Sequence, residues 1–132
     1  MFGFGKDFRV HGDVSRLVYG DRVRFSGVLF NTRSGYITIG DNVVFGHGVM
    51  VLTGEHYKTD ADVFKTVFDG NDIVIGSNCW IASGVIIIGG VTLGDNIIVG
   101  AGSVVTKSFE DGNVFIAGNP AIIKYKLKGK ET

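Results

Sequence analysis

The sequence predicts an all-β fold in which short parallel strands wind into a β-helix, a solenoid of six-residue units. Three observations predict it. An apolar residue recurs at every sixth position, turn-forming residues recur in step with it, and the chain has 21 glycines but a single proline among its 132 residues. Glycine at this frequency without proline is not typical of collagen or of proline-rich linkers, and it indicates tight turns at regular intervals.

The apolar repeat has a period of six and runs in two series. The first series is apolar throughout: Ile39, Phe45, Val51, Ile75, Ile81, Ile87, Leu93, Val99 and Val105. The second series lies two residues earlier and is nearly all small or β-branched: Ile37, Val43, Val49, Ile73, Cys79, Val85, Val91, Ile97 and Ser103. Residues two apart on a strand point to the same side, so both series are predicted to face the core.

Turns separate these short strands. The segments Gly40-Asp41-Asn42, Gly76-Ser77-Asn78 and Gly94-Asp95-Asn96 contain the residues that most readily adopt positive φ angles. The second and third of these turns are 18 residues apart, so three six-residue units close one triangular coil. Each coil then pairs in parallel with the coils above and below it and buries its apolar series against them.

We predict a single domain over residues 1–132, because the chain is too short for a second core. The N-terminal coils, 1–36, are predicted to be irregular. Tyr19–Phe25 resembles Ile39–Phe45, but the two segments are 20 residues apart instead of 18.

Regular coils are predicted over 37–108, with an interruption at 55–72 where the apolar pattern disappears before it resumes in phase at Ile73. The interruption is predicted to be an excursion loop, and long loops in compact domains are usually functional. After Ser108 the pattern fades, and the C-terminal segment, 109–132, ends in a lysine-rich tail.

The composition argues against several function classes. Thirteen basic and 13 acidic residues give no net charge, so a broad surface for nucleic acid is not expected. The longest apolar runs, such as Val85–Ile88, are too short to cross a bilayer, so no membrane insertion is expected. The first residues do not resemble a secretory signal and one cysteine permits no internal disulfide, so a cytoplasmic protein is expected.

Three motifs carry a resemblance to a known family: residues 73–83 (IVIGSNCWIAS), 99–107 (VGAGSVVTK) and 117–121 (AGNPA). With them, residues 37–123 resemble the hexapeptide-repeat acetyltransferases, the family of galactoside and maltose O-acetyltransferases and of short polysaccharide-modifying acetyltransferases. The resemblance implies a left-handed coil, acetyl-CoA as cosubstrate and no metal. It also implies a homotrimer with active sites in clefts between neighbouring subunits.

The resemblance further implies transfer of the acetyl group to a hydroxyl of a saccharide, with amine acceptors left open and with surface-polysaccharide biosynthesis as one setting. Apolar residues at outward strand positions need cover, which agrees with an oligomer. These residues are Val44, Trp80, Ile86 and Ile98.

His56 is the candidate catalytic residue. It stands at the start of the excursion, where members of the family carry their catalytic histidine. A sugar hydroxyl is a poor nucleophile, and a neutral imidazole can accept its proton as the attack begins. Glu55, Asp60 or Asp62 is a candidate to orient the imidazole.

The resemblance also implies a set of cofactor-binding residues. Trp80 would line the cleft near the thioester, the backbone N–H of Ser83 would hold the thioester, and the main chain of Ala101 would contact the pantetheine arm. Thr106 and Lys107 would approach the nucleotide end. Some members place an arginine after the Asn-Pro-Ala turn; here the first basic residue is Lys124, which would pair with a cofactor phosphate.

Two other function classes remain open at the level of sequence. A zinc-dependent lyase of the γ-carbonic-anhydrase type would use His11, His47 and His56, but their spacing does not match that family and surface histidines are the favoured interpretation. A non-catalytic β-helical scaffold is the third class.

Cys79 belongs to the inward series and is interpreted as a core residue, not a nucleophile.

Overall fold

The computed structural model describes residues 7–128. Over this range the chain forms sixteen strands and one 3₁₀ helix. In chain order these are β1 (Phe8–His11), η1 (Val14–Arg16), β2 (Leu17–Tyr19), β3 (Val28–Asn31), β4 (Ile37–Ile39), β5 (Val44–Phe45), β6 (Met50–Leu52), β7 (Glu55–Lys58), β8 (Phe64–Val67), β9 (Ile73–Ile75), β10 (Trp80–Ile81), β11 (Ile86–Ile88), β12 (Thr92–Leu93), β13 (Ile97–Val99), β14 (Val104–Val105), β15 (Val114–Gly118) and β16 (Ala121–Lys126).

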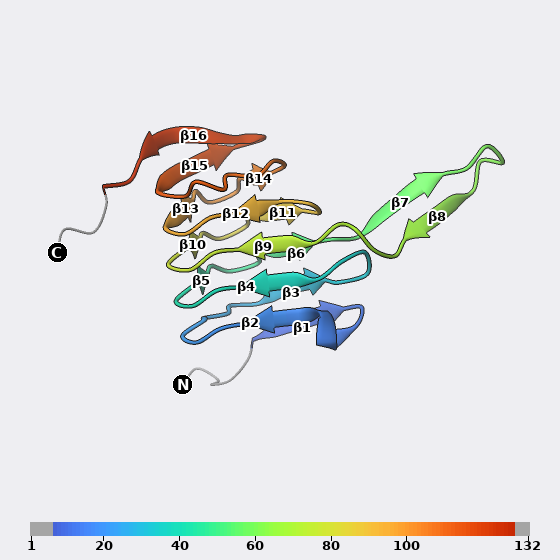
Figure 1. Cartoon of the computed structure of the whole chain (residues 1–132), viewed down its shortest axis with the longest axis horizontal. Helices are drawn as coiled ribbons and strands as arrows, with labels where there is room; N and C mark the ends of the chain where they lie inside the picture. Colours follow the sequence, from blue (N-terminus) through green and yellow to red (C-terminus); the bar gives the residue numbers. More distant parts are fainter. Residues whose placement is uncertain (1–6, 129–132) are drawn as a thin grey trace.

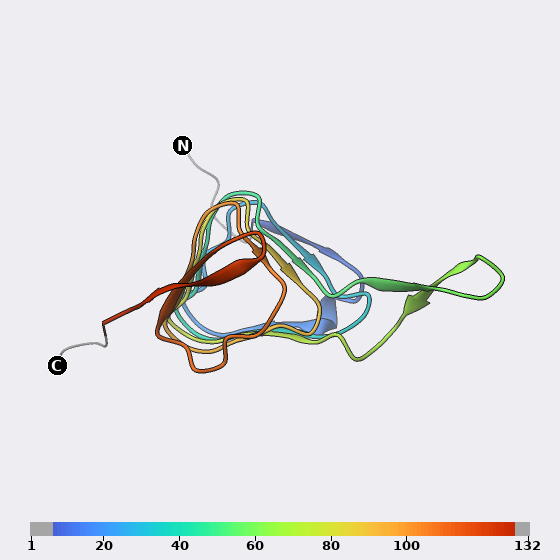
Figure 2. The same ribbon diagram turned by 90° about the horizontal axis from the view of Figure 1, so that it is seen from above.

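The strands stack into three sheets that form the faces of a triangular prism (Figures 1 and 2). The first face has the order β1-β3-β6-β11-β14, the second β2-β4-β9-β12, and the third β5-β10-β13-β15-β16. Neighbouring strands are parallel except for β15 and β16. Seen from the C-terminal end, the chain runs clockwise as it rises toward the viewer, so the coil is left-handed (Figure 2). The predicted fold class is confirmed.

Both predicted inward series are buried, which confirms the register. The registers between neighbouring coils also follow the repeat: Trp80 pairs with Val44 below it and with Ile98 above it. At the N-terminal end the core becomes aromatic. Its rings, whose centroids lie 4.7–5.8 Å apart, close that end of the prism; they belong to Phe8, Phe25, Phe30 and Phe45.

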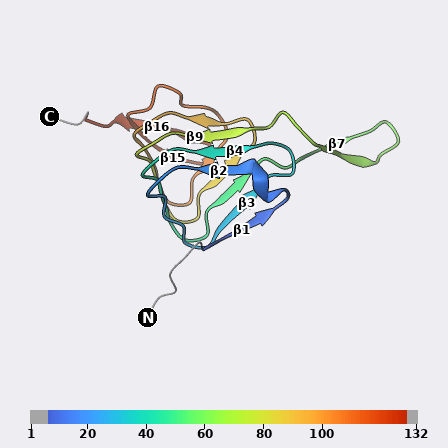
Figure 3. The ribbon, with the colours of Figure 1, turned by 60° about the horizontal axis from the view of Figure 1, so that its bottom comes forward.

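The three corners of the prism differ in chemistry. The glycine corner, between the third and first faces, turns at Gly27, Gly48, Gly84 and Gly102, all with positive φ. The asparagine corner, between the second and third faces, turns at Asn42, Asn78, Asn96 and Asn113, with φ of 55–57°. The hairpin corner, between the first and second faces, carries η1 in the first coil and, further along the chain, the excursion (Figure 3).

The excursion that the sequence predicts as a loop, 55–72, is an ordered β-hairpin. Strands β7 and β8 are antiparallel, with Glu55 opposite Val67 and Lys58 opposite Phe64. The hairpin projects from the prism (Figures 1 and 2). All four side chains of β7 are exposed, so the strand has no buried face and therefore no apolar alternation to reveal it.

The C-terminal segment is also more regular than the sequence suggests. The chain reverses after β15, and β16 pairs with it as an antiparallel strand at the edge of the third face. Much of the predicted lysine-rich tail is therefore sheet, while Lys130 lies outside the described residues, as do residues 1–6. No helix in the described range is long and apolar enough to span a membrane.

Candidate active site

His56 lies on β7, at the second residue pair from the base of the hairpin. Its side chain is exposed, and its Nδ1 atom lies 3.4 Å from the hydroxyl oxygen of Thr66 on β8. The two residues are direct cross-strand partners, so their side chains share one face of the hairpin. Within residues 7–128, the Thr66 hydroxyl is the one hydrogen-bonding neighbour of the imidazole.

None of the three carboxylates considered as orienting groups contacts this imidazole. The carboxylate of Glu55 accepts a hydrogen bond from the side-chain amide of Asn71, at the base of the hairpin. Asp62 pairs with Lys58, at 3.1 Å, within the hairpin turn. The hypothesis that Glu55 or Asp62 orients His56 is thus not supported, because both carboxylates have other partners; the nearest polar group is Thr66.

The glycine corner brings together two of the predicted cofactor-binding residues. Ser83 and Ala101 occupy equivalent turn positions in successive coils, and the Gly102 N–H donates to the Ser83 carbonyl at 2.9 Å. Below them, the His47 N–H donates to the Ser83 hydroxyl at 3.0 Å. Gly46 must remain without a side chain, because a Cβ there would overlap the Ser83 nitrogen.

Two backbone donors at this corner are unpaired. Within the described range, neither the Ser83 N–H nor the Ala101 N–H has a hydrogen-bond acceptor. Both residues are exposed. Trp80 starts β10 three residues before Ser83 and points outward with 52% of its surface exposed. The corner thus offers two free donors, one coil apart, beside an exposed indole.

His56 and the glycine corner lie at opposite edges of the first face within one chain. Strands β6 and β11 run side by side, with Met50 opposite Ile86 and Leu52 opposite Ile88. The Ser83 turn precedes this pair of strands, whereas the hairpin leaves after it. Four outward side chains between the two edges form an apolar row: Leu29, Met50, Ile86 and Val104. Below this row the outward residue of β1 is Arg9, and nearer the hairpin the outward residue of β3 is Asn31.

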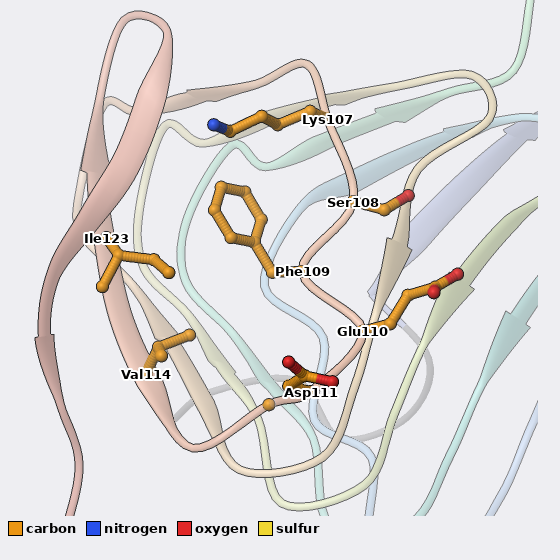
Figure 4. A pocket seen from close by; sticks show the side chains of 8 residues that line it. Lys107, Ser108, Phe109, Glu110, Asp111, Val114 and Ile123 are labelled. Atoms are coloured by element: carbon orange, nitrogen blue, oxygen red, sulfur yellow. The ribbon is translucent and has the colours of Figure 1, made fainter.

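Thr106 and Lys107 follow β14 and therefore lie at the hairpin corner, across the first face from Ala101. Lys107 lines a cavity of about 400 Å³ at the C-terminal end of the prism. Its Nζ lies 5.5 Å from the centroid of the Phe109 ring, and the side chain extends over that ring toward Ile123 (Figure 4). The cavity also has two carboxylates, from Glu110 and Asp111.

Lys124 lies on β16, next to Ile123, which lines the same cavity as Lys107. The pairing of β15 with β16 passes from Ile116↔Ile123 to Phe115↔Tyr125, so Lys124 is an extra, bulged residue in its strand. Its side chain is exposed. The structure thus stacks Ala101 on Ser83 at the glycine corner, with Trp80 on the strand that leads into it. It places His56, and Thr106 with Lys107, at the hairpin corner, and Lys124 on β16.

The three histidines do not meet within the chain. His11 ends β1 and pairs with Asn31, toward the hairpin corner, whereas His47 lies at the glycine corner with its Nδ1 against the Ser26 hydroxyl. Residues 7–128 contain no cluster of three His, Cys, Asp or Glu side chains suited to a metal ion.

Cys79 is buried, and burial raises the pKa of its thiol to about 11.

Sequence reasoning missed Thr66 and Asn71 because both lie in the segment predicted as a loop. Their importance depends on hairpin pairing: Thr66 faces His56 across the strands, and Asn71 bonds to both Thr53 and Glu55 at the base. The hairpin turn is closed by the Thr59 N–H, which donates to the Val63 carbonyl at 2.8 Å. The sequence gives little indication of this turn, because no apolar alternation accompanies it.

The repeat and the fold match those of a known class of enzymes. Residues 72–107 match the model of the bacterial transferase hexapeptide repeat. The chain is 36% identical over 96 residues to galactoside O-acetyltransferase of Lactococcus lactis and 40% identical over 89 residues to WcaF, a colanic acid biosynthesis acetyltransferase of Escherichia coli. These alignments cover 72% and 67% of this chain but 45% and 47% of the relatives, so the chain spans about half their length.

Solved structures agree with this assignment. A maltose O-acetyltransferase from Clostridium difficile is 30% identical, with a TM-score of 0.73, and the match covers 96% of this chain and 70% of that one. An acetyltransferase from Vibrio cholerae in complex with acetyl-CoA is 26% identical, with a TM-score of 0.64, and the match covers 93% and 72%. The chain belongs to the hexapeptide-repeat acetyltransferase family.

Proposed function

We propose that this chain transfers an acetyl group from acetyl-CoA to a hydroxyl group of a saccharide, as one subunit of a homotrimer, with His56 as the general base. One observation carries the proposal. Unpaired N–H groups of Ser83 and Ala101 lie beside the exposed Trp80, and an exposed imidazole projects from the other edge of the same face.

The glycine corner suits the acyl end of the cofactor. Successive coils are about 4.8 Å apart, so the two free N–H groups form a short row of donors. The pantetheine arm is a chain of amides and methylenes, and its carbonyl groups accept such hydrogen bonds. From Ala101 to Thr106 the chain crosses one face, about 17 Å at 3.3 Å per residue, so a long extended cofactor is needed to reach Lys107.

The hairpin suits a cleft between subunits. Tyr57, Val63, Phe64 and Phe68 on or beside it each expose more than half of their surface. Apolar groups gathered on a projecting element require cover. In a closed threefold ring, the hairpin of one subunit reaches over the glycine corner of the next and brings His56 to Ser83. This arrangement accounts for the separation of the two groups within one chain.

The proposed reaction is a direct transfer. His56 accepts the proton of the acceptor hydroxyl at Nε2, while Nδ1–H donates to Thr66, which fixes the tautomer. The hydroxyl oxygen attacks the thioester carbonyl carbon, and the Ser83 N–H stabilises the resulting oxyanion. As the C–S bond breaks, the imidazolium returns its proton to the thiolate. The products are the acetyl ester and CoA, and no acyl-enzyme forms.

A saccharide acceptor rests on the names of the relatives, which act in galactoside, maltose and colanic acid chemistry. An amine acceptor is the alternative within the same mechanism. A cytoplasmic location is proposed from the single cysteine and from the use of acetyl-CoA.

Replacement of His56 tests the proposal. His56→Ala is expected to lower kcat by about 10²–10⁴, the usual contribution of a positioned general base. Its unfolding transition should match that of the wild type, because the side chain is exposed and outside the core. Thiol release from acetyl-CoA in the presence of candidate saccharides measures the rates.

His11→Ala is the matched control, since His11 is an exposed histidine on β1 with no part in the proposed site. It should retain full activity. An active His56→Ala together with an inactive His47→Ala would move the base to His47, which lies beside Ser83 in the same chain.

A further inference from the structure

The base of the hairpin is held to the prism by two separate groups of contacts. On the ascending side, the Glu55 N–H donates to the buried hydroxyl of Ser34 at 3.0 Å. The Asn71 amide then joins the Thr53 carbonyl, at 3.2 Å, to the Glu55 carboxylate. These contacts fix the residue next to His56. On the descending side Asn71 is also held by its own N–H, which donates to the Ser34 carbonyl at 3.1 Å. Phe68 and Asp69, between β8 and Asn71, have a different anchor.

That anchor is Arg16, from η1 in the first coil. Its Nη1 donates to the Phe68 carbonyl at 3.0 Å, and its Nη2 lies 2.9 Å from the Asp69 carboxylate. The guanidinium also lies 5.2 Å from the centroid of the Tyr36 ring. Only 21% of the Arg16 side chain is exposed, against 80% of that of Asp69. A planar guanidinium can make all these contacts in one orientation, which an ammonium cannot.

The first coil is built to present this side chain. Asp13 caps η1 by accepting the Ser15 N–H at 2.9 Å, and its carbonyl accepts the Thr32 hydroxyl, also at 2.9 Å. Arg16 itself reaches the Thr32 carbonyl at 3.4 Å on its way to Phe68. The first coil is 20 residues long instead of 18. The helix η1 lies in the connection between β1 and β2, at the hairpin corner of that coil.

We propose that Arg16 is a positioning residue: by fixing Phe68 and Asp69 it sets the direction of the hairpin and thereby the place of His56. This inference rests on the proposed function of His56. Phe68 lies two residues after Thr66, the cross-strand partner of His56, so a single residue pair, Glu55 with Val67, separates the anchor from the imidazole. An isolated two-stranded hairpin is marginally stable in water, so its direction depends on its base.

Arg16→Met tests this inference, because it keeps the apolar stem and removes the guanidinium. Amide hydrogen exchange over 55–69 is expected to rise about tenfold. The kcat is expected to fall about tenfold, since small displacements of a catalytic group are costly, while KM for acetyl-CoA stays unchanged. Arg16→Lys should recover part of the kcat. Arg9→Met, which removes an exposed arginine of β1, is the matched control and should change neither quantity.

Asp69→Ala is the second variant, and because Asp69 is exposed its loss cannot unfold the core. It should raise exchange in the same segment and lower kcat, though less than Arg16→Met. Unchanged exchange over 55–69 in both variants would overturn the anchor. Faster exchange with an unchanged kcat would overturn the positioning role. If His56→Ala is itself fully active, the proposed function fails, while the exchange measurement still decides whether Arg16 holds the hairpin.

Discussion

Cys79 and Trp80 are neighbours in the chain with opposite surroundings. Cys79 is buried, and its Sγ lies 3.4 Å from the Gly94 carbonyl, whereas Trp80 points outward. Burial favours the neutral thiol and raises its pKa to about 11 from 9.0. Near neutral pH the thiol therefore stays protonated and is not a nucleophile, as expected from its place in the inward series.

This shift predicts how stability depends on pH. Between about pH 9 and pH 11 the unfolded chain has lost the thiol proton while the folded chain keeps it. The unfolded state then binds fewer protons, so the free energy of unfolding falls as pH rises through this window. Urea unfolding of wild type and Cys79→Ala at pH 8 and pH 10.5 measures the effect. The variant should lose less stability between the two values, and equal losses would contradict the shift.

At the scale of the element, the close stacking of turns at the glycine corner predicts a second effect. A Cβ at Gly46 would overlap the Ser83 nitrogen in the next coil, so the turn must move. Gly46→Ala is expected to destabilise the protein by about 1–3 kcal/mol, as overpacking does, and to lower activity by displacing the Ser83 N–H.

Gly48→Ala is the matched control for that prediction. Gly48 lies in the same turn with φ of 69°, and a Cβ there would meet no atom within 4 Å. It should cost about 1–2 kcal/mol of backbone strain but leave the Ser83 N–H in place. Thermal unfolding and thiol-release rates of the two variants separate stability from activity. Equal activity losses would contradict a specific role for the Ser83 turn.

The elements differ in how well the sequence predicts them. The coils were predictable because each strand has one buried face, so a period of six is visible from Ile37 to Val105. The hairpin was not, because exposed strands such as β7 carry no such constraint. Strand β16 pairs with β15 although most of its side chains are exposed, so only its partner identifies it.

The residues of the candidate site differ in the same way: those within the repeat were predictable, and those in irregular segments were not. Ser83, Ala101 and Trp80 were named by the family resemblance, and the repeat fixes that Ser83 and Ala101 lie one coil apart at the same corner. Arg16 and Asp69 were not predicted, since 53 residues separate them and neither belongs to the apolar series. A contact of that kind depends on where two irregular segments meet, which local patterns do not encode.

At the scale of the whole molecule, the proposed site requires two subunits, and this can be tested by mixing. His56→Ala would remove the base from every hairpin. Ala101→Glu would place a charged side chain over every glycine corner, at an exposed turn where it disturbs no core packing. Each variant alone is expected to be nearly inactive, the first in kcat and the second in binding of acetyl-CoA.

Trimers formed from equal amounts of the two variants should recover activity. A working site needs an intact hairpin, which half of the subunits carry, next to an intact corner, which the other half carry, so about a quarter of the sites are restored. Co-expression of the two chains, followed by thiol-release assays and sedimentation of the mixed protein, measures the recovery. If His56 and Ala101 instead served one site within the same chain, every subunit would carry one defect, and the mixture would remain as inactive as its parts.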